Sequence, residues 1–254
     1  MAEAAAPGVL VTRPAAQAAT LCRLLEAEGC AVLALPTLTI EPLATTEPLA
    51  ALRAALPCAL AVFISANAVR HALPLIAAAG GLPDDCTLAA VGAASAAALT
   101  AAGFRDVVVP DVRFDSEGLL ALPPLEAVAG RRVVIFRGED GRRLLAQTLA
   151  ARGAEVHEVV CYRRRPALEQ APRLAAWLAA GVIAVLTATS RAGYEALLEL
   201  AGEEAPALAA LPLAVLAPAL AEHARARGHR GPVVSAEHAT DAALATAVRR
   251  LIRC

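Results

Sequence analysis

The segment from Arg131 to Pro166 has the clearest pattern in the chain and constrains its fold most strongly. Val133 to Phe136 form a short apolar, β-branched run, which predicts a buried strand. The strand is expected to end at Arg137-Gly138, where the glycine permits a tight turn. A helical pattern of leucines follows and stops at a glycine, after which Val156 to Tyr162 read as extended. The segment therefore predicts a strand–helix–strand unit, and in such units ligands bind where the first strand ends.

The same alternation of apolar runs and amphipathic helical patterns continues along the chain. Strands are expected at residues 9–12, 31–35, 60–64, 88–91, 106–109, 133–136, 156–162 and 182–187, with helical patterns between them and a final helix at 240–252. The run 37–43 alternates weakly and reads as a connector rather than a core strand. Because β and α patterns alternate throughout, the sequence predicts an α/β architecture with parallel sheets.

A faint internal repeat bears on the number of domains. Ser65, Gly92, Gly103 and Ser116 follow one another at nearly the same spacing as Thr189, Ala217, Gly228 and Thr240. Four landmarks in register indicate two copies of one structural body.

The second copy of this repeat has too few strands to form a sheet that matches the first. The strand–helix–strand pattern of residues 9–35 could supply the missing two strands. We therefore expect domain 1 to comprise residues 1–36 plus 167–254, with domain 2, residues 44–158, inserted into it. The connectors 37–43 and 159–166 would then run side by side as a two-stranded hinge, with a cleft between the domains.

Composition argues against several classes of protein. Hydrophobic residues make up 58% of the chain, but Pro, Gly or a charge interrupts every apolar run before it reaches the length of a membrane span. The first residues lack a basic stretch, so we expect no signal peptide and a cytosolic location. A net charge of −1 and few aromatic residues argue against nucleic-acid binding.

Metal and nucleotide sites also lack support in the sequence. Cysteines stand at positions 22, 30, 58, 86, 161 and 254 without a CxxC pair, which argues against a zinc site and against a disulfide framework. The histidines, His71, His157, His223, His229 and His238, have no ligand spacing, and we expect them to be solvated or to cap helices. Glycine-rich nucleotide loops and the motifs of serine hydrolases and zinc proteases do not occur.

Several short motifs occur in a fixed order along the chain. They are Thr12-Arg13-Pro14 with Gln17, Phe63 to Val69, Val91-Gly92 with Ser95 and Ala96, Ser116 to Leu119, Arg137-Gly138-Glu139 with Gly141-Arg142, Arg152-Gly153-Ala154, and Tyr162 followed by Arg163. Each motif is weak by itself, but their order and spacing resemble the uroporphyrinogen-III synthase family over essentially the whole chain.

This resemblance implies a fold, an activity and a cellular setting. The fold would be two similar flavodoxin-like, three-layer α/β domains joined by a two-stranded β-ladder hinge. The activity would be that of a cofactor-independent hydro-lyase of porphyrin and haem biosynthesis, which cyclises hydroxymethylbilane with loss of water and inversion of ring D. The resemblance also implies a cytoplasmic monomer without a metal, and it leaves open a transient contact with the preceding enzyme of the pathway.

The implied substrate carries eight carboxylates, so its site needs many hydrogen-bond donors. Strand-to-helix turns supply backbone N–H groups, and hydroxyls or glycines stand at nearly every such turn of this chain. The candidate substrate-binding residues are Thr12, Ser65, Gly92, Ser95, Ser116, Gly138, Thr189, Ser190 and Thr240, together with Arg13 and Arg137. The alternatives are ordinary helix capping for the hydroxyls and ordinary surface positions for the arginines.

Tyr162 is the candidate catalytic residue. It is one of two tyrosines and lies at the expected crossover between the domains. Its phenol could donate a proton to the departing hydroxyl of the bilane, and the alternative is that the ring only anchors the hinge. The arginines that follow it, Arg163 to Arg165, are expected to solvate the hinge.

One turn departs from the family pattern. Residues Ala217 to Ala221 read Ala-Pro-Ala-Leu-Ala, where the family usually has glycine and hydroxyl residues. The loss of these donors puts carboxylate binding at this turn in doubt. It keeps open an alternative function, that of a catalytically weakened relative which acts as a two-domain tetrapyrrole- or anion-binding sensor.

Overall fold

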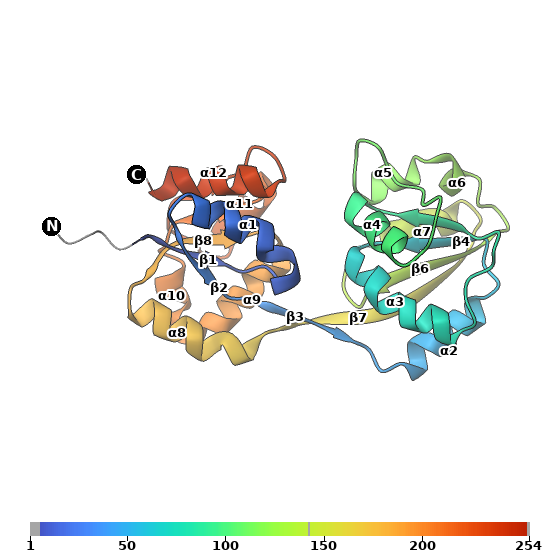
Figure 1. Cartoon of the computed structure of the whole chain (residues 1–254), viewed down its shortest axis with the longest axis horizontal. Coiled ribbons are helices and arrows are strands. Elements are labelled where there is room, and N and C mark those ends of the chain that lie inside the picture. Colours follow the sequence, from blue (N-terminus) through green and yellow to red (C-terminus); the bar gives the residue numbers. More distant parts are fainter. Residues whose placement is uncertain (1–5, 142, 253–254) are drawn as a thin grey trace. The chain divides into compact units, whose positions relative to one another are not determined.

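The computed structural model describes residues 6–141 and 143–252, and it divides into two compact units (Figure 1). Unit 1 comprises Met1–Thr39 and Arg165–Cys254, and unit 2 comprises Ile40–Arg164. Unit 2 is therefore inserted into the chain of unit 1.

Unit 1 is built on a sheet of five strands. Their order is β10 (Val233–Ser235), β9 (Leu213–Val215), β8 (Ile183–Ala188), β1 (Gly8–Val11) and β2 (Ala31–Ala34), with neighbouring strands parallel. The helical segments are α1 (Ala15–Ala27), η1 (Leu168–Gln170), α8 (Ala171–Ala179), α9 (Arg191–Ala201), η2 (Gly202–Glu204), α10 (Ala205–Leu208), α11 (Pro218–Ala226) and α12 (Asp241–Ile252).

Strand β1 shows why this sheet is covered on both faces. Successive side chains of a strand point to opposite faces. Leu10 packs in the cluster that contains Leu197 of α9 and Leu220 of α11, whereas Val9 and Val11 pack in the cluster of α1 and α12. A strand that is apolar at every position is thus buried between two helical layers, as expected for a parallel sheet.

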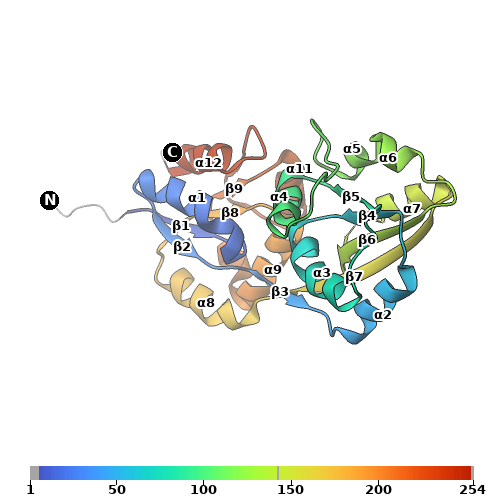
Figure 2. The same cartoon turned by 45° about the vertical axis from the view of Figure 1, so that its right-hand side comes forward.

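Unit 2 repeats this architecture (Figure 2). The sheet order is β3 (Leu38–Pro42), β7 (Glu155–Pro166), β6 (Arg132–Gly138), β4 (Leu60–Phe63) and β5 (Thr87–Ala90), and the pairs from β7 to β5 are parallel. The helices are α2 (Thr46–Ala55), α3 (Ala66–Ala78), α4 (Ala93–Ala101), α5 (Ser116–Leu120), α6 (Pro123–Glu126) and α7 (Leu144–Ala151). Phe63 and Phe136 stack at 4.8 Å within the cluster under α3, while Val62 and Ile135 face the layer of α5 and α7.

The predicted α/β class with parallel sheets is confirmed, but one expected strand and one expected connector differ in detail. Residues 106–109 form only an isolated bridge from Val108 to Ala89, and the run ends at Pro110, which has no N–H to extend a ladder. The run 37–43 contains the strand β3, which pairs with β7. Both β3 and β7 cross the boundary between the two units.

The helix caps correct the register of the internal repeat. The Ser65 hydroxyl accepts a hydrogen bond from the Ala68 N–H at 3.0 Å, and the Ser190 hydroxyl accepts one from the Gly193 N–H at 3.1 Å. The counterpart of Ser65 is therefore Ser190, and the alignment of Ser65 with Thr189 was wrong by one residue.

A second cap needs the same correction. The carboxylate of Asp115 accepts from the Gly118 N–H at 2.8 Å, just as the Thr240 hydroxyl accepts from the Ala243 N–H at 3.2 Å. Asp115 rather than Ser116 is thus the counterpart of Thr240. With both corrections the separations between consecutive landmarks become identical in the two units.

A buried polar pair in unit 1 corrects the expectation for one histidine. The hydroxyl of Tyr194 lies 3.1 Å from Nδ1 of His229, and both side chains are buried. Burial raises the pKa of Tyr194 to about 12 and lowers the pKa of His229. His229 is thus a core residue that ties α9 to the segment after α11, and it is not solvated.

Within the described residues, no helix is both long and apolar enough to cross a lipid bilayer.

Candidate functional site

Tyr162 stands at the centre of a cluster of polar groups in unit 2, at the carboxyl ends of β4 and β6. Its side chain is 1% exposed, and its hydroxyl lies 3.2 Å from Oγ of Ser65. Nη2 of Arg164 donates a hydrogen bond to the same phenol oxygen at 3.3 Å. We call Tyr162, Ser65, Arg164, His71 and Gly138 the tyrosine cluster.

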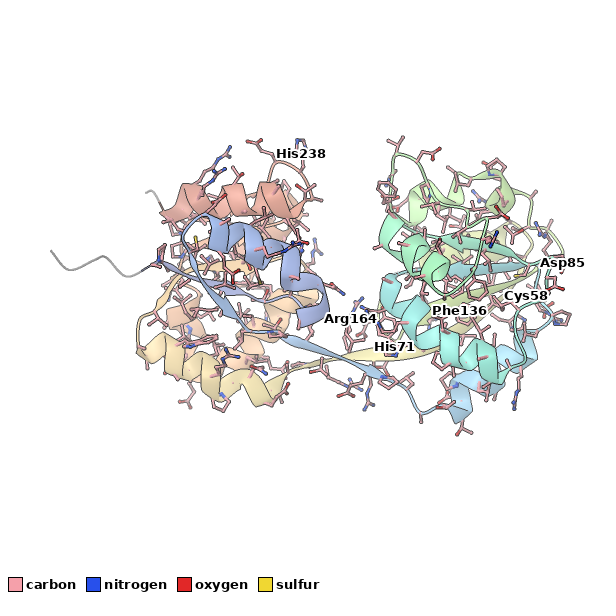
Figure 3. The ribbon with its side chains drawn as sticks, viewed as in Figure 1. Cys58, His71, Asp85, Phe136, Arg164 and His238 are labelled. Carbon is pink, nitrogen blue, oxygen red and sulfur yellow. The ribbon has the colours of Figure 1, made fainter. Side chains whose placement is uncertain are left out.

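Two of these groups lie against the aromatic ring itself. The ring of His71 stacks on Tyr162 with centroids 5.6 Å apart, and the guanidinium carbon of Arg164 lies 5.7 Å from the ring centroid. Figure 3 shows His71 and Arg164 on neighbouring parts of unit 2. Burial lowers the pKa of His71, and the charge of Arg70 lowers it further, so both favour the neutral imidazole. Arg164 is therefore the cation closest to the phenol within the cluster.

Gly138 leaves the space that the tyrosine ring occupies. It pairs with Tyr162 across the β6–β7 ladder, and a Cβ at this position would lie 2.7 Å from Cζ of the ring. The expected role of Gly138 in a tight turn is wrong, because Gly138 is the last residue of β6 and its φ is not positive. The turn glycine is Gly141, with a φ of 126°.

Replacing Gly138 by alanine is expected to displace the Tyr162 ring, because a methyl group at 2.7 Å overlaps it. We expect a loss of about 2–3 kcal/mol of unfolding free energy from such overpacking. Chemical denaturation measures the change. The matched control is Gly92→Ala, where the new Cβ meets Phe114 at an ordinary 3.7 Å, and losing the glycine cap should cost less than about 1 kcal/mol. Equal losses in the two variants would contradict this account of Gly138.

Arg137 is buried and fully engaged within unit 2. It forms an ion pair with Glu158 of β7, and its Nε and Nη2 donate to the carbonyls of Gly138 at 3.0 Å and Gly141 at 3.2 Å. Its guanidinium thus neutralises a carboxylate of the protein and holds the loop that follows β6. This arrangement does not favour the predicted contact of Arg137 with a substrate carboxylate.

A small cavity opens beside this ion pair. It has a volume of about 210 Å³ and is lined by Ile64, Val91, Ser116, Ile135, Arg137, Leu145, Ala146 and Glu158. Ile64 and Val91 directly follow β4 and β5, so the cavity lies at the carboxyl end of the sheet. Beside it, α5 is capped by the carboxylate of Asp115, whose pKa the Gly118 N–H lowers. An internal anion thus already occupies this helix start.

Two further candidate substrate-binding residues in unit 2, Gly92 and Ser95, lie at the start of α4. Gly92 is the N-cap of this helix with extended backbone, and it has no side chain to cap the first turn. Ser95 lies in that first turn and is 4% exposed. The backbone amides of this turn, rather than side chains, are the donors that a ligand could reach.

In unit 1 the predicted binding residues divide into buried and exposed ones. The hydroxyl of Thr12 is buried and donates to the Thr187 carbonyl at 2.8 Å, which ties β1 to β8. Ser190 and Thr240 are exposed and cap α9 and α12, and Thr189 is half-buried beside Ser190. Thr12 therefore has a structural bond, whereas Ser190 and Thr240 combine capping with accessibility.

Arg13 is paired with a carboxylate of the protein. Its Nη1 contacts Oδ1 of Asp241 in the first turn of α12, and the two side chains are 15% and 20% exposed.

The turn that departs from the family pattern lies elsewhere in unit 1, where Ala217 is the N-cap of α11 and Pro218 follows. No side chain caps α11, so only backbone amides are available there to bind a ligand.

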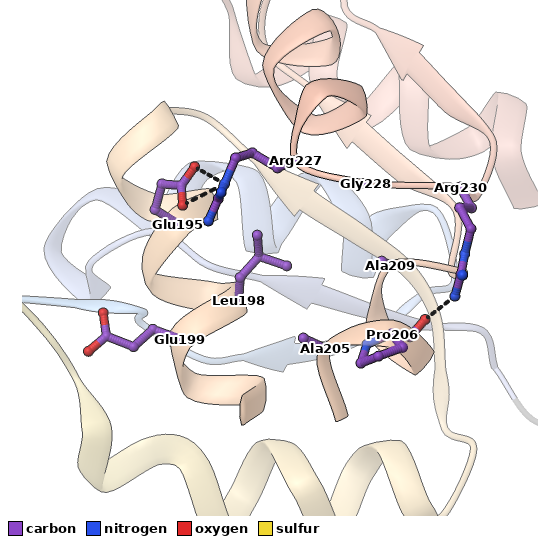
Figure 4. A pocket seen from close by; sticks show the side chains of 9 residues that line it. All are labelled: Glu195, Leu198, Glu199, Ala205, Pro206, Ala209, Arg227, Gly228 and Arg230. Carbon is purple, nitrogen blue, oxygen red and sulfur yellow. Dashed lines mark hydrogen bonds and ion pairs between the residues drawn. The ribbon is translucent and has the colours of Figure 1, made fainter. Parts of the chain in front are cut away.

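The largest of the pockets described does not lie at the strand ends that carry the predicted site residues. It has a volume of about 580 Å³ and is lined by Glu195, Leu198, Glu199, Ala205, Pro206, Ala209, Arg227, Gly228 and Arg230 (Figure 4). Glu195 pairs with Arg227 at 2.9 Å, and Arg230 donates to the Pro206 carbonyl at 3.1 Å. The pocket is lined by α9, by α10 and by the segments that follow α10 and α11, and none of its lining residues is a predicted site residue. Within the described residues no group of three or more His, Cys, Asp and Glu side chains could hold a metal ion.

Some members of the site were not predicted from the sequence. Asp241, Asp115 and Glu158 supply carboxylates at the strand ends, and His71 and Arg164 contact Tyr162. For Arg164 a signal existed, because residues two apart on a strand share one face, which places it beside Tyr162. The expectation that Arg164 only solvates a connector is therefore incomplete, whereas Arg163 forms an ion pair with Glu41 at 2.9 Å.

The fold and the site define a class: a chain of two similar parallel α/β units, one inserted into the other, with polar groups and helix starts at the strand ends. A family model described as uroporphyrinogen-III synthase HemD matches residues 19–245. The chain belongs to the uroporphyrinogen-III synthase family.

Individual relatives agree with this assignment. The chain is 51% identical over 76 residues to the uroporphyrinogen-III synthase of Salmonella typhimurium, a match that covers 30% of each chain. It is 36% identical over 161 residues to that of Synechococcus elongatus, which covers 62% of this chain and 60% of the relative. In these matches the chain thus spans less than two thirds of the relatives' own length.

A solved structure supports the fold. The crystal structure of a mutant uroporphyrinogen III synthase from Thermus thermophilus superposes with a TM-score of 0.64 and 22% sequence identity. The superposition covers 98% of this chain and 99% of the other. The similarity in architecture therefore extends over both units.

Proposed function

We propose that this protein converts hydroxymethylbilane into uroporphyrinogen III, with loss of water and inversion of ring D, as a cofactor-independent hydro-lyase of haem biosynthesis. The observation that carries the proposal is the tyrosine cluster, in which a phenol is held between Ser65 and Arg164 at the carboxyl end of a parallel sheet. Membership of the family favours the enzyme over a sensor that lacks turnover.

Tyr162 is proposed to donate its proton to the hydroxyl group that leaves the bilane. Departure as water instead of hydroxide lowers the barrier and leaves an azafulvene cation. The guanidinium of Arg164 then stabilises the phenolate by charge, and Ser65 keeps the oxygen in place. Because Tyr162 is 1% exposed, side chains around it must shift before the substrate reaches its hydroxyl.

The carboxylates of the substrate are proposed to bind at helix starts in each unit. The first turns of α3, α4, α9 and α11 begin where β4, β5, β8 and β9 end. Unpaired N–H groups and the helix dipole favour anions there, and binding fixes the flexible bilane in one conformation. At α11 the backbone can serve this purpose even though Ala217 to Ala221 lack hydroxyls.

The test is an assay of the product isomer. Purified protein is supplied with hydroxymethylbilane by the preceding enzyme, and the products are oxidised to porphyrins and separated by chromatography. We expect mainly isomer III. A mixture dominated by isomer I, as in the uncatalysed reaction, contradicts the proposal, and tight binding of uroporphyrinogen without turnover would instead support the sensor.

Replacing Asp241 by asparagine is expected to tighten substrate binding. Asp241 holds the Arg13 guanidinium, and a substrate carboxylate must compete with it for this cation. A partly exposed pair of this kind is worth up to about 1 kcal/mol, so the KM for hydroxymethylbilane should fall roughly fivefold. Steady-state kinetics measures the change, and Arg13→Met is the control that should weaken binding. An unchanged KM in both variants would show that Arg13 does not meet the substrate.

The remaining expectations extend this proposal. We infer that the protein acts as a monomer in the cytoplasm and contacts the preceding enzyme of the pathway only transiently. Residues 1–36 with 167–254 and 44–158 would act as domains, with 37–43 and 159–166 as the hinge. The strands β3 and β7, which cross the boundary between the units, support this assignment.

A further inference from the structure

Two cysteine thiols lie side by side at the end of unit 2 opposite to the tyrosine cluster. Sγ of Cys58 and Sγ of Cys86 are 3.6 Å apart. Cys58 precedes β4 and Cys86 precedes β5, so both stand at the amino end of the sheet, whereas Ser65 follows the carboxyl end of β4. Figure 3 shows Cys58 next to Asp85 at one edge of the unit, away from His71 and Arg164.

The backbone brings these cysteines within the reach of a covalent bond. β4 and β5 are paired in parallel, and the Thr87 N–H donates to the Ala59 carbonyl at 3.0 Å directly beside the thiols. In the register of this pair Leu60 lies opposite Thr87, so Cys86 lies opposite Ala59 and one residue along from Cys58. Strands about 4.8 Å apart with a rise of about 3.3 Å per residue put the two cysteine Cα atoms roughly 6 Å apart, within the range that disulfides bridge. The two sulfurs, 3.6 Å apart, therefore start close to bonding distance.

We propose that Cys58 and Cys86 form a reversible disulfide when the protein meets a low-molecular-weight disulfide. The sulfur of Cys86 attacks one sulfur of the small disulfide and releases a first thiol. The sulfur of Cys58 then attacks Cys86 and releases a second thiol. The two cysteines lose two protons and two electrons in total, and the small disulfide takes up these protons and electrons as it becomes two thiols.

An open pocket gives the small disulfide access to this pair. It has a volume of about 330 Å³ and is lined by Leu82, Pro83, Asp84, Cys86, Leu88, Gly103, Phe104, Arg105 and Asp106. Cys86 is half-buried at its wall, while Cys58 is 3% exposed behind it. The order of attack follows from this difference, because only Cys86 faces the incoming reagent.

The charges around the pair suit Cys58 to the second attack. In the reduced pair the hydrogen bond between the two thiols lowers the pKa of Cys58 and raises the pKa of Cys86, so accessibility and not acidity puts Cys86 first. Once Cys86 has reacted, that bond is gone, and the Arg132 guanidinium still lowers the pKa of Cys58. Arg132 and Arg131 donate to the carbonyls of Leu56 at 3.4 Å and Ala59 at 3.2 Å, on either side of Cys58. Nearby cations of this kind increase the fraction of reactive thiolate.

The other described cysteines differ from this pair. Burial raises the pKa of Cys161 to about 12, and its Sγ contacts the Val159 carbonyl at 3.3 Å. Burial also raises the pKa of Cys22 and of Cys30. These three thiols therefore provide an internal comparison for the reactivity of Cys58 and Cys86.

The test exposes the purified, reduced chain to bis(2-hydroxyethyl) disulfide, which is uncharged, and follows its mass. We expect a loss of about 2 Da, from two hydrogens, without a retained adduct, and a peptide that links Cys58 to Cys86. Dithiothreitol should reverse the change. The oxidised protein should unfold at a midpoint on the order of 5 °C higher, since the new bond closes the loop between β4 and β5.

Two variants keep the outcome interpretable. In Cys58→Ala we expect a stable adduct of the reagent on Cys86, and in Cys86→Ala we expect neither the adduct nor the link. Cyclisation activity should be unchanged in Cys86→Ala, so a failure of the proposed enzymatic function is seen separately. A wild-type chain that retains both thiols, or that keeps the adduct on Cys86 without closing the link, would overturn the proposal.

Discussion

Replacing Tyr162 by phenylalanine lowers kcat for cyclisation by on the order of 10²-fold in our expectation, because the variant loses the proton that helps water leave. The ring keeps its stacking on His71 and its place over Gly138, so the fold persists. The hydroxyl makes hydrogen bonds only with Ser65 and Arg164 within the described residues, and losing them costs about 1–2 kcal/mol of stability. Single-turnover kinetics with hydroxymethylbilane measures the chemical step.

The other tyrosine provides the control for this experiment. Tyr194 is equally buried and bonds to His229 at 3.1 Å, but it lies in the core of unit 1. Tyr194→Phe removes the same atom at a similar cost in stability and should leave kcat unchanged. If Tyr162→Phe turns over as fast as the wild type, Tyr162 is a structural anchor of β7 and the catalytic acid lies elsewhere.

Replacing Arg137 by methionine is expected to destabilise the protein by about 3 kcal/mol, since one partner of a largely buried ion pair is removed. The side chains of Arg137 and Glu158 are 6% and 25% exposed, so the carboxylate that remains is poorly solvated. The carbonyls of Gly138 and Gly141 also lose their donor. Urea denaturation of the purified variant measures the loss.

A double-mutant cycle separates the charge from the packing. In Arg137→Met with Glu158→Met, both charges are gone, and we expect part of the stability to return. Arg13→Met is the matched variant in unit 1, where the more exposed pair with Asp241 should contribute about 1 kcal/mol or less. If Arg137→Met is as stable as the wild type while substrate binding is lost, Arg137 acts as a ligand and not as a structural residue.

The local pattern of the sequence predicted the architecture well, for a physical reason. Strands such as Val9–Val11 and Val133–Phe136 are apolar at each position because parallel sheets are covered on both faces. Helix starts were also visible, since capping depends on residues only three apart, as for Ser65 and Ser190. The alignment of Ser116 with Thr240 was wrong because both serine and aspartate can cap a helix, and only the hydrogen bond shows that Asp115 does so here.

The candidate site was predicted only in part. Tyr162, Ser65 and Gly138 were singled out as separate residues, but nothing in their order indicated that one ring joins them. Their contacts join β7 to the start of α3 and the end of β6, which are far apart in the chain. The pairing of strands decides such contacts, and it depends on the whole sheet.

The sequence by itself determined the alternation of strands and helices, the places where helices begin and the family to which the chain is similar, because these depend on residue type and short spacing. Only the tertiary structure decided which charges are free. Arg13 and Arg137 both stand at strand ends, yet Asp241 and Glu158 neutralise them across long stretches of chain. Ion pairs form between side chains that folding brings within a few ångströms, and no local pattern encodes that proximity.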